Sequence, residues 1–362
     1  MLTSRLLDHA IATLSQTPDN DFVNALNGQS YVFRTFFKGM KPRDMTGLDV
    51  KFNAIMKGDS GDTDTDATST GFGVWDGAYD EIPVIGAEYM AQGTINWSQY
   101  IWHWSITEKE IVQNSGEEGY IDLGDSKLEG AMTRFANILE RHFWSTSGYL
   151  HEDDDAPWIL GPEYWVTDDG YHYNDAAGAS GLLVGNIDPT SSDYNDPDTS
   201  TNRWRNQYQE ITSPNQLLDG MDDLYIDTKF ESPPDVSMNT DPQYNRFKIV
   251  YNKGGFKSWK RLMRRLKEPL DNAKPTFNNT PVEMADKMAA RSDGTNQGFF
   301  FNLSTWKAWV AKGKNFSKDK VQTPQNQPGV RYQRGHFWPA IGCIDRRLNG
   351  KIFGFGDDLI ED

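Results

Sequence analysis

The sequence has very little cysteine: Cys343 is the only one in 362 residues. A single thiol cannot form an intramolecular disulfide, so the fold must be stabilised by packing and by contacts between subunits. Cys343 lies in the apolar segment 340–344, Ala-Ile-Gly-Cys-Ile. This context favours a small buried hydrophobic side chain over a reactive nucleophile.

Long hydrophobic runs are also missing. Hydrophobic residues make up 37% of the chain, and no apolar run approaches the roughly 20 residues that span a bilayer. The first residues, Met-Leu-Thr-Ser-Arg-Leu-Leu-Asp-His, lack the basic and then apolar pattern of a signal peptide. We therefore expect a protein that is made in a cytoplasm and that has no membrane as a partner.

The motifs of the common enzyme classes are absent. The six histidines are scattered, and none lies in a His-Glu-x-x-His motif or beside a pair of cysteines. The sequence contains no Gly-x-Ser-x-Gly elbow, no phosphate-binding Gly-x-x-x-x-Gly-Lys loop and no dinucleotide fingerprint. We therefore expect no enzymatic activity, no catalytic residues and no cofactor.

Two acidic segments deserve comparison with calcium sites. Asp62, Asp64 and Asp66 alternate as at the start of an EF-hand loop. That loop needs glycine at its sixth position and glutamate at its twelfth, where this chain has Ala67 and Gly73. The segment 151–155, His-Glu-Asp-Asp-Asp, would need further ligands from elsewhere. We favour solvated acidic turns over metal sites for both.

Basic residues are in the minority, with 36 Lys and Arg against 52 Asp and Glu, for a net charge of −16. A protein that reads duplex DNA needs a basic surface to displace counterions from the phosphates, so this class is disfavoured. A container for DNA is compatible with the charge, because an acidic inner wall repels the polymer. The charge also keeps a protein made at high copy number soluble before it assembles.

The one basic block is 257–267, which carries an apolar stripe formed by Trp259, Leu262, Met263 and Leu266. This pattern predicts an amphipathic helix, and one interpretation is contact with nucleic acid or a membrane. We favour a second interpretation, in which the helix neutralises acidic segments of the same or a neighbouring chain.

What the sequence does contain is a long aromatic strand followed by a long helix. Aromatic residues make up 13% of the chain, and the strand is predicted at 95–106. Its apolar positions change from odd to even near Ser98 and Gln99, which predicts a bulge or bend there. An apolar stripe predicts a helix over 125–144, about 30 Å long, with Asp125 or Ser126 as its N-cap.

A protruding hairpin is predicted before this spine. Strand-like segments at 49–56 and 81–90 flank the polar, glycine-rich segment 58–77. A two-stranded hairpin is marginally stable on its own in water. We therefore expect the hairpin to lie on a neighbouring subunit.

The remaining pattern is mixed α+β without internal repeats. Helices are predicted at 4–14, 214–227 and 257–267, and strands at 235–238, 246–251, 298–302, 330–333 and 335–344. The segment 150–200 is acidic and rich in loops, which is typical of a binding or interface role.

The order of these elements resembles the major capsid proteins of tailed bacteriophages with the Hong Kong 97-type fold. The matching segments after the aromatic strand are 107–116, 120–122, the spine helix, 181–188, 203–206, 234–240 and 345–354. The resemblance covers about residues 20–354 and depends on the order of several weak motifs.

The resemblance implies an α+β fold with a peripheral (P) domain, an axial (A) domain and two extended arms. The implied division is an N-terminal arm at 1–45, an E-loop hairpin at 46–93, a P domain at 94–180 with spine helix 125–144, an A domain at 181–320, a P-domain return strand at 321–345 and a C-terminal segment at 346–362. The subunit would form pentamers and hexamers of an icosahedral shell around double-stranded DNA.

We expect two groups of residues to contact neighbouring subunits in such a shell. The arm and hairpin group is Phe36, Phe37, Phe52, Trp75, Tyr79 and Glu81. The charged group is Glu108, Glu110, Glu117 and Glu118 on one subunit, opposite Arg346 and Arg347 on another. Exposed charge pairs of this kind add orientation more than energy.

The expected partners are further copies of the chain, a portal, scaffolding or decoration proteins, and packaged DNA without sequence-specific contact. The expected location is the virion, after assembly in a host cytoplasm. Three alternatives stay open from the sequence. They are a carbohydrate-active or carbohydrate-binding protein, a phage tail or baseplate protein, and the shell of a cellular nanocompartment.

Overall fold

The computed structural model describes residues 35–36, 42–55, 90–113, 117–145, 158–170, 183–189, 204–213, 216–230, 247–265, 275–278, 280–291, 293–327 and 329–356. The predicted helix 4–14, hairpin tip 58–77, acidic segment 151–155 and strand 235–238 lie outside these residues. The chain folds as two compact units, the first made of 1–50, 96–161 and 308–341, and the second of 51–95, 162–307 and 342–362.

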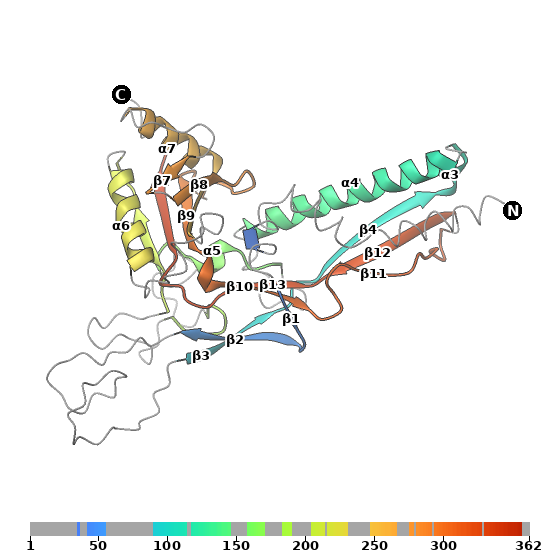
Figure 1. Cartoon of the computed structure of the whole chain (residues 1–362), viewed down its shortest axis with the longest axis horizontal. Helices are drawn as coiled ribbons and strands as arrows, with labels where there is room; N and C mark the ends of the chain where they lie inside the picture. The colour runs from blue at the N-terminus through green and yellow to red at the C-terminus, as the bar shows by residue number, and fades with distance from the viewer. Residues whose placement is uncertain are drawn as a thin grey trace, which may run out of the picture. The chain divides into compact units, whose positions relative to one another are not determined.

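The first unit is built on a long antiparallel strand pair and a long helix (Figure 1). Strand β4 (Tyr100–Thr107) pairs with β12 (Val330–Phe337), and β11 (Ser317–Lys318) pairs with the other edge of β12. Helix α4 (Glu117–Phe143) runs along this sheet. Burial alternates along β4, with the even-numbered residues from Tyr100 to Ile106 buried, as the sequence predicts.

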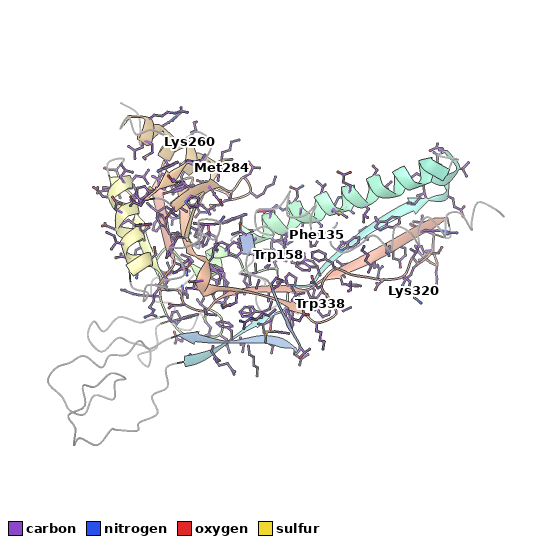
Figure 2. The ribbon with its side chains drawn as sticks, in the orientation of Figure 1. Phe135, Trp158, Lys260, Met284, Lys320 and Trp338 are labelled. Atoms are coloured by element: carbon purple, nitrogen blue, oxygen red, sulfur yellow. The ribbon has the colours of Figure 1, made fainter. Side chains whose placement is uncertain are left out.

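Phe135 marks the centre of the packing between α4 and the sheet (Figure 2). Its ring centroid lies 6.0 Å from that of Tyr100, 6.1 Å from Phe316 and 5.9 Å from Phe337, each in an edge-on arrangement. Each large apolar side chain buried in this way contributes about 1.5–3 kcal/mol. The aromatic content of the sequence is thus used to attach the helix to the strand pair.

The predicted aromatic strand is two strands that belong to different sheets. Strand β3 (Met90–Asn96) pairs with β2 (Asp49–Ile55), whereas β4 pairs with β12. The bend expected near Ser98 falls in the break between them, where the Ser98 amide donates to the Pro339 carbonyl at 3.1 Å. The change from odd to even positions therefore marks a change of sheet.

Helix α4 begins at Glu117 and is 27 residues long, or about 40 Å. The predicted start at Asp125 or Ser126 is wrong, because both residues lie inside the helix. The sequence Gly124-Asp125-Ser126 has the composition of a helix start. A glycine in a helix interior costs only about 1 kcal/mol, which a continuous hydrogen-bond ladder can tolerate.

A further small sheet contains β1 (Arg43–Met45), β10 (Trp306–Ala311) and β13 (Pro339–Cys343), in the order β1-β10-β13. Strand β1 runs parallel to β10. Helix α3 (Glu108–Gln113) follows directly on β4. The Glu108 amide donates to the Gly329 carbonyl at 2.8 Å, which ties the start of α3 to the residue before β12.

The second unit is built on a mixed sheet of six strands in the order β5-β14-β9-β6-β8-β7. The strands are β5 (Gln207–Glu210), β6 (Phe247–Tyr251), β7 (Thr276–Phe277), β8 (Thr280–Met284), β9 (Asn296–Asn302) and β14 (Gly350–Phe355). Two helices, α6 (Gln216–Phe230) and α7 (Lys253–Arg265), pack on one face. Both share a single apolar core with Ile249, Phe300 and Ile352 of the sheet.

Short segments complete this unit. Helix α5 (Pro162–Trp165) is buried throughout, and a 3₁₀ turn at Leu303–Thr305 precedes β10. The predicted helices 214–227 and 257–267 correspond to α6 and α7, and the predicted strands 246–251 and 298–302 correspond to β6 and β9.

Three glycines lie directly beneath aromatic rings of a neighbouring strand. Gly335 of β12 lies opposite Trp102 of β4, and Gly298 of β9 lies opposite Tyr251 of β6. Gly93 of β3 is covered by the ring of Phe52. A Cβ atom at any of the three positions would overlap the ring. The sheets therefore accept these large rings only because the facing positions have no side chain.

The predicted domain boundaries at 180/181 and 320/321 differ from those of the two compact units, which lie at 161/162 and 307/308. The C-terminal strand β14 belongs to the second unit. The assignment of these units as P and A domains stays a prediction.

Candidate assembly surfaces and the buried polar network

The aromatic residues expected on arm contacts are only partly described. Phe36 is fully buried, with its ring centroid 4.8 Å from that of Phe143, and Phe52 is 6% exposed and lies 6.0 Å from Trp165. Both rings are thus packed within their own subunit, and their expected contact with a neighbouring subunit stays a prediction. Phe37, Trp75, Tyr79 and Glu81 lie outside the described residues.

Glu110, expected to pair with another subunit, has a role at the start of α3 instead. The Glu110 amide donates to Thr107 Oγ1 at 3.3 Å, and Glu110 Oε2 accepts from the Thr107 amide at 3.0 Å. This reciprocal arrangement is a capping box. The other carboxylate oxygen accepts from Lys127 Nζ of α4 at 2.7 Å. Glu110 therefore connects α3 to α4 within one subunit.

Of the other three predicted acidic contacts, the structure describes the side chain of Glu108 alone. Glu108 is exposed, and no ion pair engages it among the described side chains, so it stays available to a neighbour. Glu117 and Glu118 form the first residues of α4, and their side chains lie outside the described ones.

The pKa of Glu110 is lowered, first by the hydrogen bond from Lys127 and then by the Thr107 amide. A carboxyl group with a lower pKa in the folded chain than in the unfolded chain stabilises the fold at a pH above its unfolded pKa. That stabilisation is lost as the pH falls through the folded pKa. Because the pair is about one third exposed, we expect a coupling energy of only about 0.2–1 kcal/mol. A double-mutant cycle of Glu110→Gln and Lys127→Met, measured by urea denaturation at pH 7 and pH 3, should show a larger coupling energy at pH 7 than at pH 3. Equal coupling at both values would contradict the assignment.

Arg346, expected on the surface, is fully buried. Its Nε donates to the Trp165 carbonyl at 2.7 Å, and its Nη1 to the Trp204 carbonyl at 2.8 Å. Its Nη2 donates to Asn206 Oδ1 at 3.1 Å. The guanidinium is enclosed, and its donors face acceptors of its own chain; the contact expected with another subunit stays a prediction.

Arg347, the neighbouring residue, is partly buried and pairs with Asp345 of the same chain, with Nη2 to Oδ2 at 2.9 Å. The Arg347 amide also donates to Asp345 Oδ1. Arg347 thus has a local partner, and the pairing expected with a glutamate of another subunit stays a prediction.

Asn206 completes the hydrogen bonding around Arg346. Its Oδ1 accepts from the Thr167 amide at 2.8 Å, and its Nδ2 donates to the Thr167 carbonyl at 2.9 Å. These hydrogen bonds join three parts of the chain: the segment 165–170, the residues just before β5 and the residues just before β14. Burial lowers the pKa of Arg346 to about 10, so the guanidinium is charged at neutral pH.

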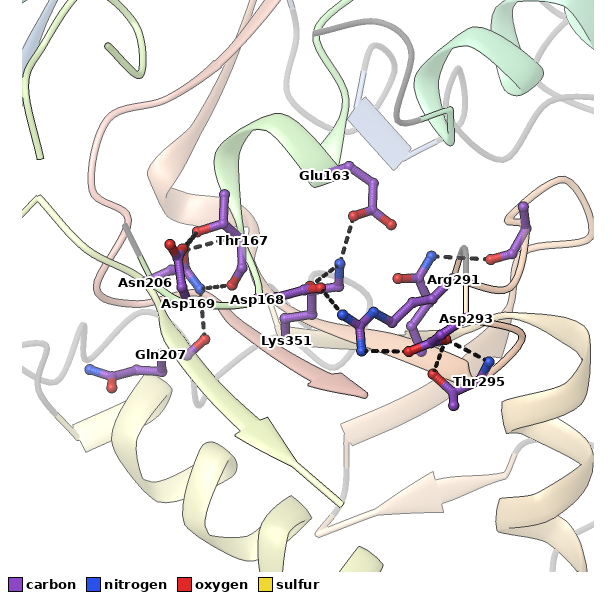
Figure 3. Close-up of polar contacts among 12 residues, drawn as sticks. Glu163, Thr167, Asp168, Asp169, Asn206, Gln207, Arg291, Asp293, Thr295 and Lys351 are labelled. Atoms are coloured by element: carbon purple, nitrogen blue, oxygen red, sulfur yellow. Dashed lines mark hydrogen bonds and ion pairs between the residues drawn. The ribbon is translucent and has the colours of Figure 1, made fainter. Parts of the chain in front are cut away.

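Lys351 of β14 is the centre of a second buried network (Figure 3). Its Nζ lies 2.6 Å from Glu163 Oε2 and 2.5 Å from Asp168 Oδ1, and its side chain is 3% exposed. Arg291 continues the network, with Nη2 2.6 Å from Asp168 Oδ2 and Nη1 3.1 Å from Asp293 Oδ2. The network lies on the sheet face opposite α6 and α7, because Lys351 alternates with Ile352 of the apolar core.

The electrostatics of Lys351 follow from these neighbours. Burial alone would lower its pKa, but Glu163 and Asp168 raise it above the ordinary value of a lysine. A raised lysine pKa means that the ammonium stabilises the fold at neutral pH and that this contribution is lost at strongly alkaline pH. The arrangement holds the segment 162–170 on β14, and its chemistry is that of a structural ion network.

Sequence reasoning missed both networks. A lysine or arginine in a sequence is usually exposed, and the partners are distant, with Glu163 lying 188 positions from Lys351 and Trp165 lying 181 from Arg346. One signal was available: Lys351 lies in Gly-Lys-Ile-Phe-Gly-Phe, an otherwise apolar strand of the kind that is buried on both faces.

Cys343 is fully buried, as predicted from its apolar context. Its Sγ donates to the Asp345 carbonyl at 3.0 Å, and burial raises its pKa to about 12. The reactive thiolate is therefore scarce at neutral pH. We expect Ellman's reagent at pH 8 to titrate less than a tenth of a thiol per native chain within an hour, and one thiol after unfolding in guanidinium chloride. Rapid titration of the native chain would show that the thiol is accessible.

In the part of the chain that the structure describes, no group of three or more His, Cys, Asp or Glu side chains is placed to hold a metal ion. No helix in the same part is long and apolar enough to cross a membrane.

No protein-family model matches the sequence, and no curated protein matches it. Solved structures do. The capsid asymmetric unit of cyanophage A-1(L) aligns over 87% of this chain and 90% of its own, at 10% identity and a TM-score of 0.55. The procapsid of satellite phage P4 aligns over 97% of both chains at 11% identity and a TM-score of 0.48. The SrpI encapsulin complex from Synechococcus elongatus aligns over 90% of both chains at 8% identity and a TM-score of 0.44.

The assignment of the fold depends on the first of these, because its TM-score exceeds 0.5 over most of both chains. This chain therefore has the Hong Kong 97-type fold of phage capsid proteins.

Proposed function

We propose that the chain is the major capsid protein of a tailed phage, and that its copies form the pentamers and hexamers of an icosahedral shell around double-stranded DNA. The observation that carries the proposal is the similarity to a phage capsid subunit over 87% of this chain. The net charge of −16 is compatible with a wall that does not bind the packaged polymer.

The buried networks support this function by making each subunit rigid. In the second unit, Arg346 before β14 and Lys351 within β14 hold segments that are distant in sequence, and in the first unit α4 packs on β4 and β12. A shell protein has to keep one shape while its contacts adjust between five-fold and six-fold rings. Such rings need heterologous interfaces, in which two different surfaces of the subunit meet.

The proposed partners are other copies, a portal, packaged DNA, and scaffolding or decoration proteins, and the proposed location is the virion. Within the subunit, the first unit corresponds to the P domain and the second to the A domain. Glu108 at the start of α3 remains a candidate contact with a neighbour, because it is exposed.

Electron microscopy of the purified full chain tests the proposal. Closed polyhedral shells or rings of five and six subunits are the expected result. Monomers that bind glycans would support the carbohydrate alternative and contradict the capsid. Particles purified from a phage-producing host should contain nuclease-resistant DNA, whereas shells filled with an enzyme would indicate a nanocompartment.

A further inference from the structure

Helices α6 and α7 lie on the same face of the six-stranded sheet but toward opposite edges of it. Helix α6 packs on β5, β14 and β9, and α7 packs on β9, β6 and β8. The apolar side of each helix is buried in the common core, to which α6 contributes Leu217, Met221 and Leu224 and α7 contributes Trp259. The outward sides are therefore what the two edges present to another molecule (Figure 1).

The outward side of α7 is basic. Four of its cationic side chains are exposed and a fifth is half-buried, with Nζ of Lys260 4.6 Å from the centroid of the Phe256 ring. The exposed ones are Lys253, Lys257, Arg261 and Arg264. No described carboxylate forms an ion pair with any of these four. In a chain of net charge −16, such a basic surface is an exception that the described side chains of its own subunit do not neutralise.

The outward side of α6 is acidic. Its exposed carboxylates are Asp219, Asp222, Asp223 and Asp227. Asp222 accepts a hydrogen bond from Asn278 at 2.9 Å, and no described cation forms an ion pair with any of the four. Partial burial and, after it, the nearby negative charge of Asp223 raise the pKa of Asp227.

The two helices carry opposite charges, and no ion pair joins their described side chains. An acidic edge and a basic edge on one subunit are complementary surfaces for two copies arranged head to tail. Heterologous contacts of this type generate closed rings when the rotation closes. Complementary charge patches steer encounter and fix register more than they add affinity, which suits a contact that must tolerate both five-fold and six-fold rings.

We infer that α6 of one subunit faces α7 of the next around each pentamer and hexamer, so that the partner of the basic helix is a second copy of this chain. The inference rests on the proposed capsid function and specifies which surfaces close the rings. Contact of α7 with packaged DNA is the competing outcome.

Matched charge reversals test the inference in the full chain. The α7 variant is Lys257→Glu with Arg261→Glu, and the α6 variant is Asp219→Lys with Asp223→Lys. Each pair lies one helical turn apart on an exposed side, so both variants should fold, as circular dichroism and thermal melting can verify. The control is Lys312→Glu with Lys320→Glu, which alters two exposed lysines and changes the net charge as the α7 variant does.

At 0.15 M NaCl, each one-sided variant should reduce the yield of rings and shells at least tenfold, while the control stays within twofold of the wild type. The variant with all four substitutions should recover the wild-type yield, because the charges are exchanged rather than removed. Raising NaCl to 1 M should weaken wild-type assembly, because exposed charges are screened within a few ångströms at that ionic strength.

A mixture of the two one-sided variants gives the sharpest result. One variant is basic on both helices and the other is acidic on both, so they should alternate around a ring. Alternation closes a ring of six without a like-charge contact but leaves one such contact in a ring of five. We expect the equimolar mixture to form hexamers and to form few pentamers, as counted by native mass spectrometry.

Several outcomes would overturn the inference. They are one-sided variants that assemble as the wild type does, a fourfold variant that fails to recover, or an α7 variant that forms normal shells and loses only DNA packaging. A wild-type chain that forms no rings or shells at all would instead refute the proposed function, and the inference with it.

Discussion

Replacing Arg346 by leucine should lower the free energy of unfolding of the subunit by about 3–5 kcal/mol. The guanidinium is fully buried and donates to the carbonyls of Trp165 and Trp204 and to Asn206. Leucine fills part of the volume but leaves the buried carbonyls of Trp165 and Trp204 without the donors that Arg346 supplies, whereas Asn206 Oδ1 keeps its hydrogen bond from the Thr167 amide. Each such orphaned group costs about 1–3 kcal/mol, which accounts for the size of the effect.

Arg347→Leu is the matched control for this substitution. Arg347 pairs with Asp345, and the side chains are 18% and 7% exposed, so its loss should cost about 1–3 kcal/mol, because one largely buried carboxylate loses its partner. Arg346→Lys should fail to recover the wild-type stability, because one ammonium cannot reproduce the planar fork of donors. Urea denaturation of the unassembled subunits measures all three. Equal effects at 346 and 347 would contradict the role assigned to Arg346.

The second large effect is expected at Gly161. A Cβ atom there would overlap the carbonyl oxygen of Phe143, the last residue of α4. Because the obstacle is backbone, no change of rotamer can relieve it. We expect Gly161→Ala to lower the free energy of unfolding by about 3 kcal/mol, near the upper end of the usual cost of overpacking.

Gly130→Ala provides the control with the same chemical change. Gly130 is exposed within α4, and a Cβ atom there would meet nothing within 4 Å. Alanine is the better helix former, so this substitution should raise the free energy of unfolding by about 0.5–1 kcal/mol. The two glycines should thus respond in opposite directions in the same denaturation experiment. A neutral Gly161→Ala would show that the chain near residue 161 can move away from α4.

Much of the fold could be predicted from the sequence where side-chain periodicity reports burial. The alternation in 100–106 correctly identified the buried face of β4, and the change of parity near Ser98 correctly located the break before it. Helices α6 and α7 were found within four residues at each end. These features depend on local pattern, which a single sequence contains.

The candidate contacts were harder to predict, because the sequence around a charged residue does not indicate which residue it will pair with. Thr107 and Glu110 have the spacing of a capping box, yet Glu110 was interpreted as a contact with another subunit. The structure gives it Thr107 and Lys127. Arg346 was assigned to the surface because buried arginines are rare, and its acceptors come from segments far away in the chain. Such long-range pairings follow from the topology and leave no local trace.

The ring of Trp102 covering Gly335 has a consequence for how this protein can vary among its relatives. The two residues face each other across β4 and β12, and a side chain at 335 would occupy the space of the indole. Lineages that gain a methyl group at position 335 should therefore also have lost the indole at position 102. The two codons are expected to evolve as a pair, although 232 intervening positions separate them in the gene.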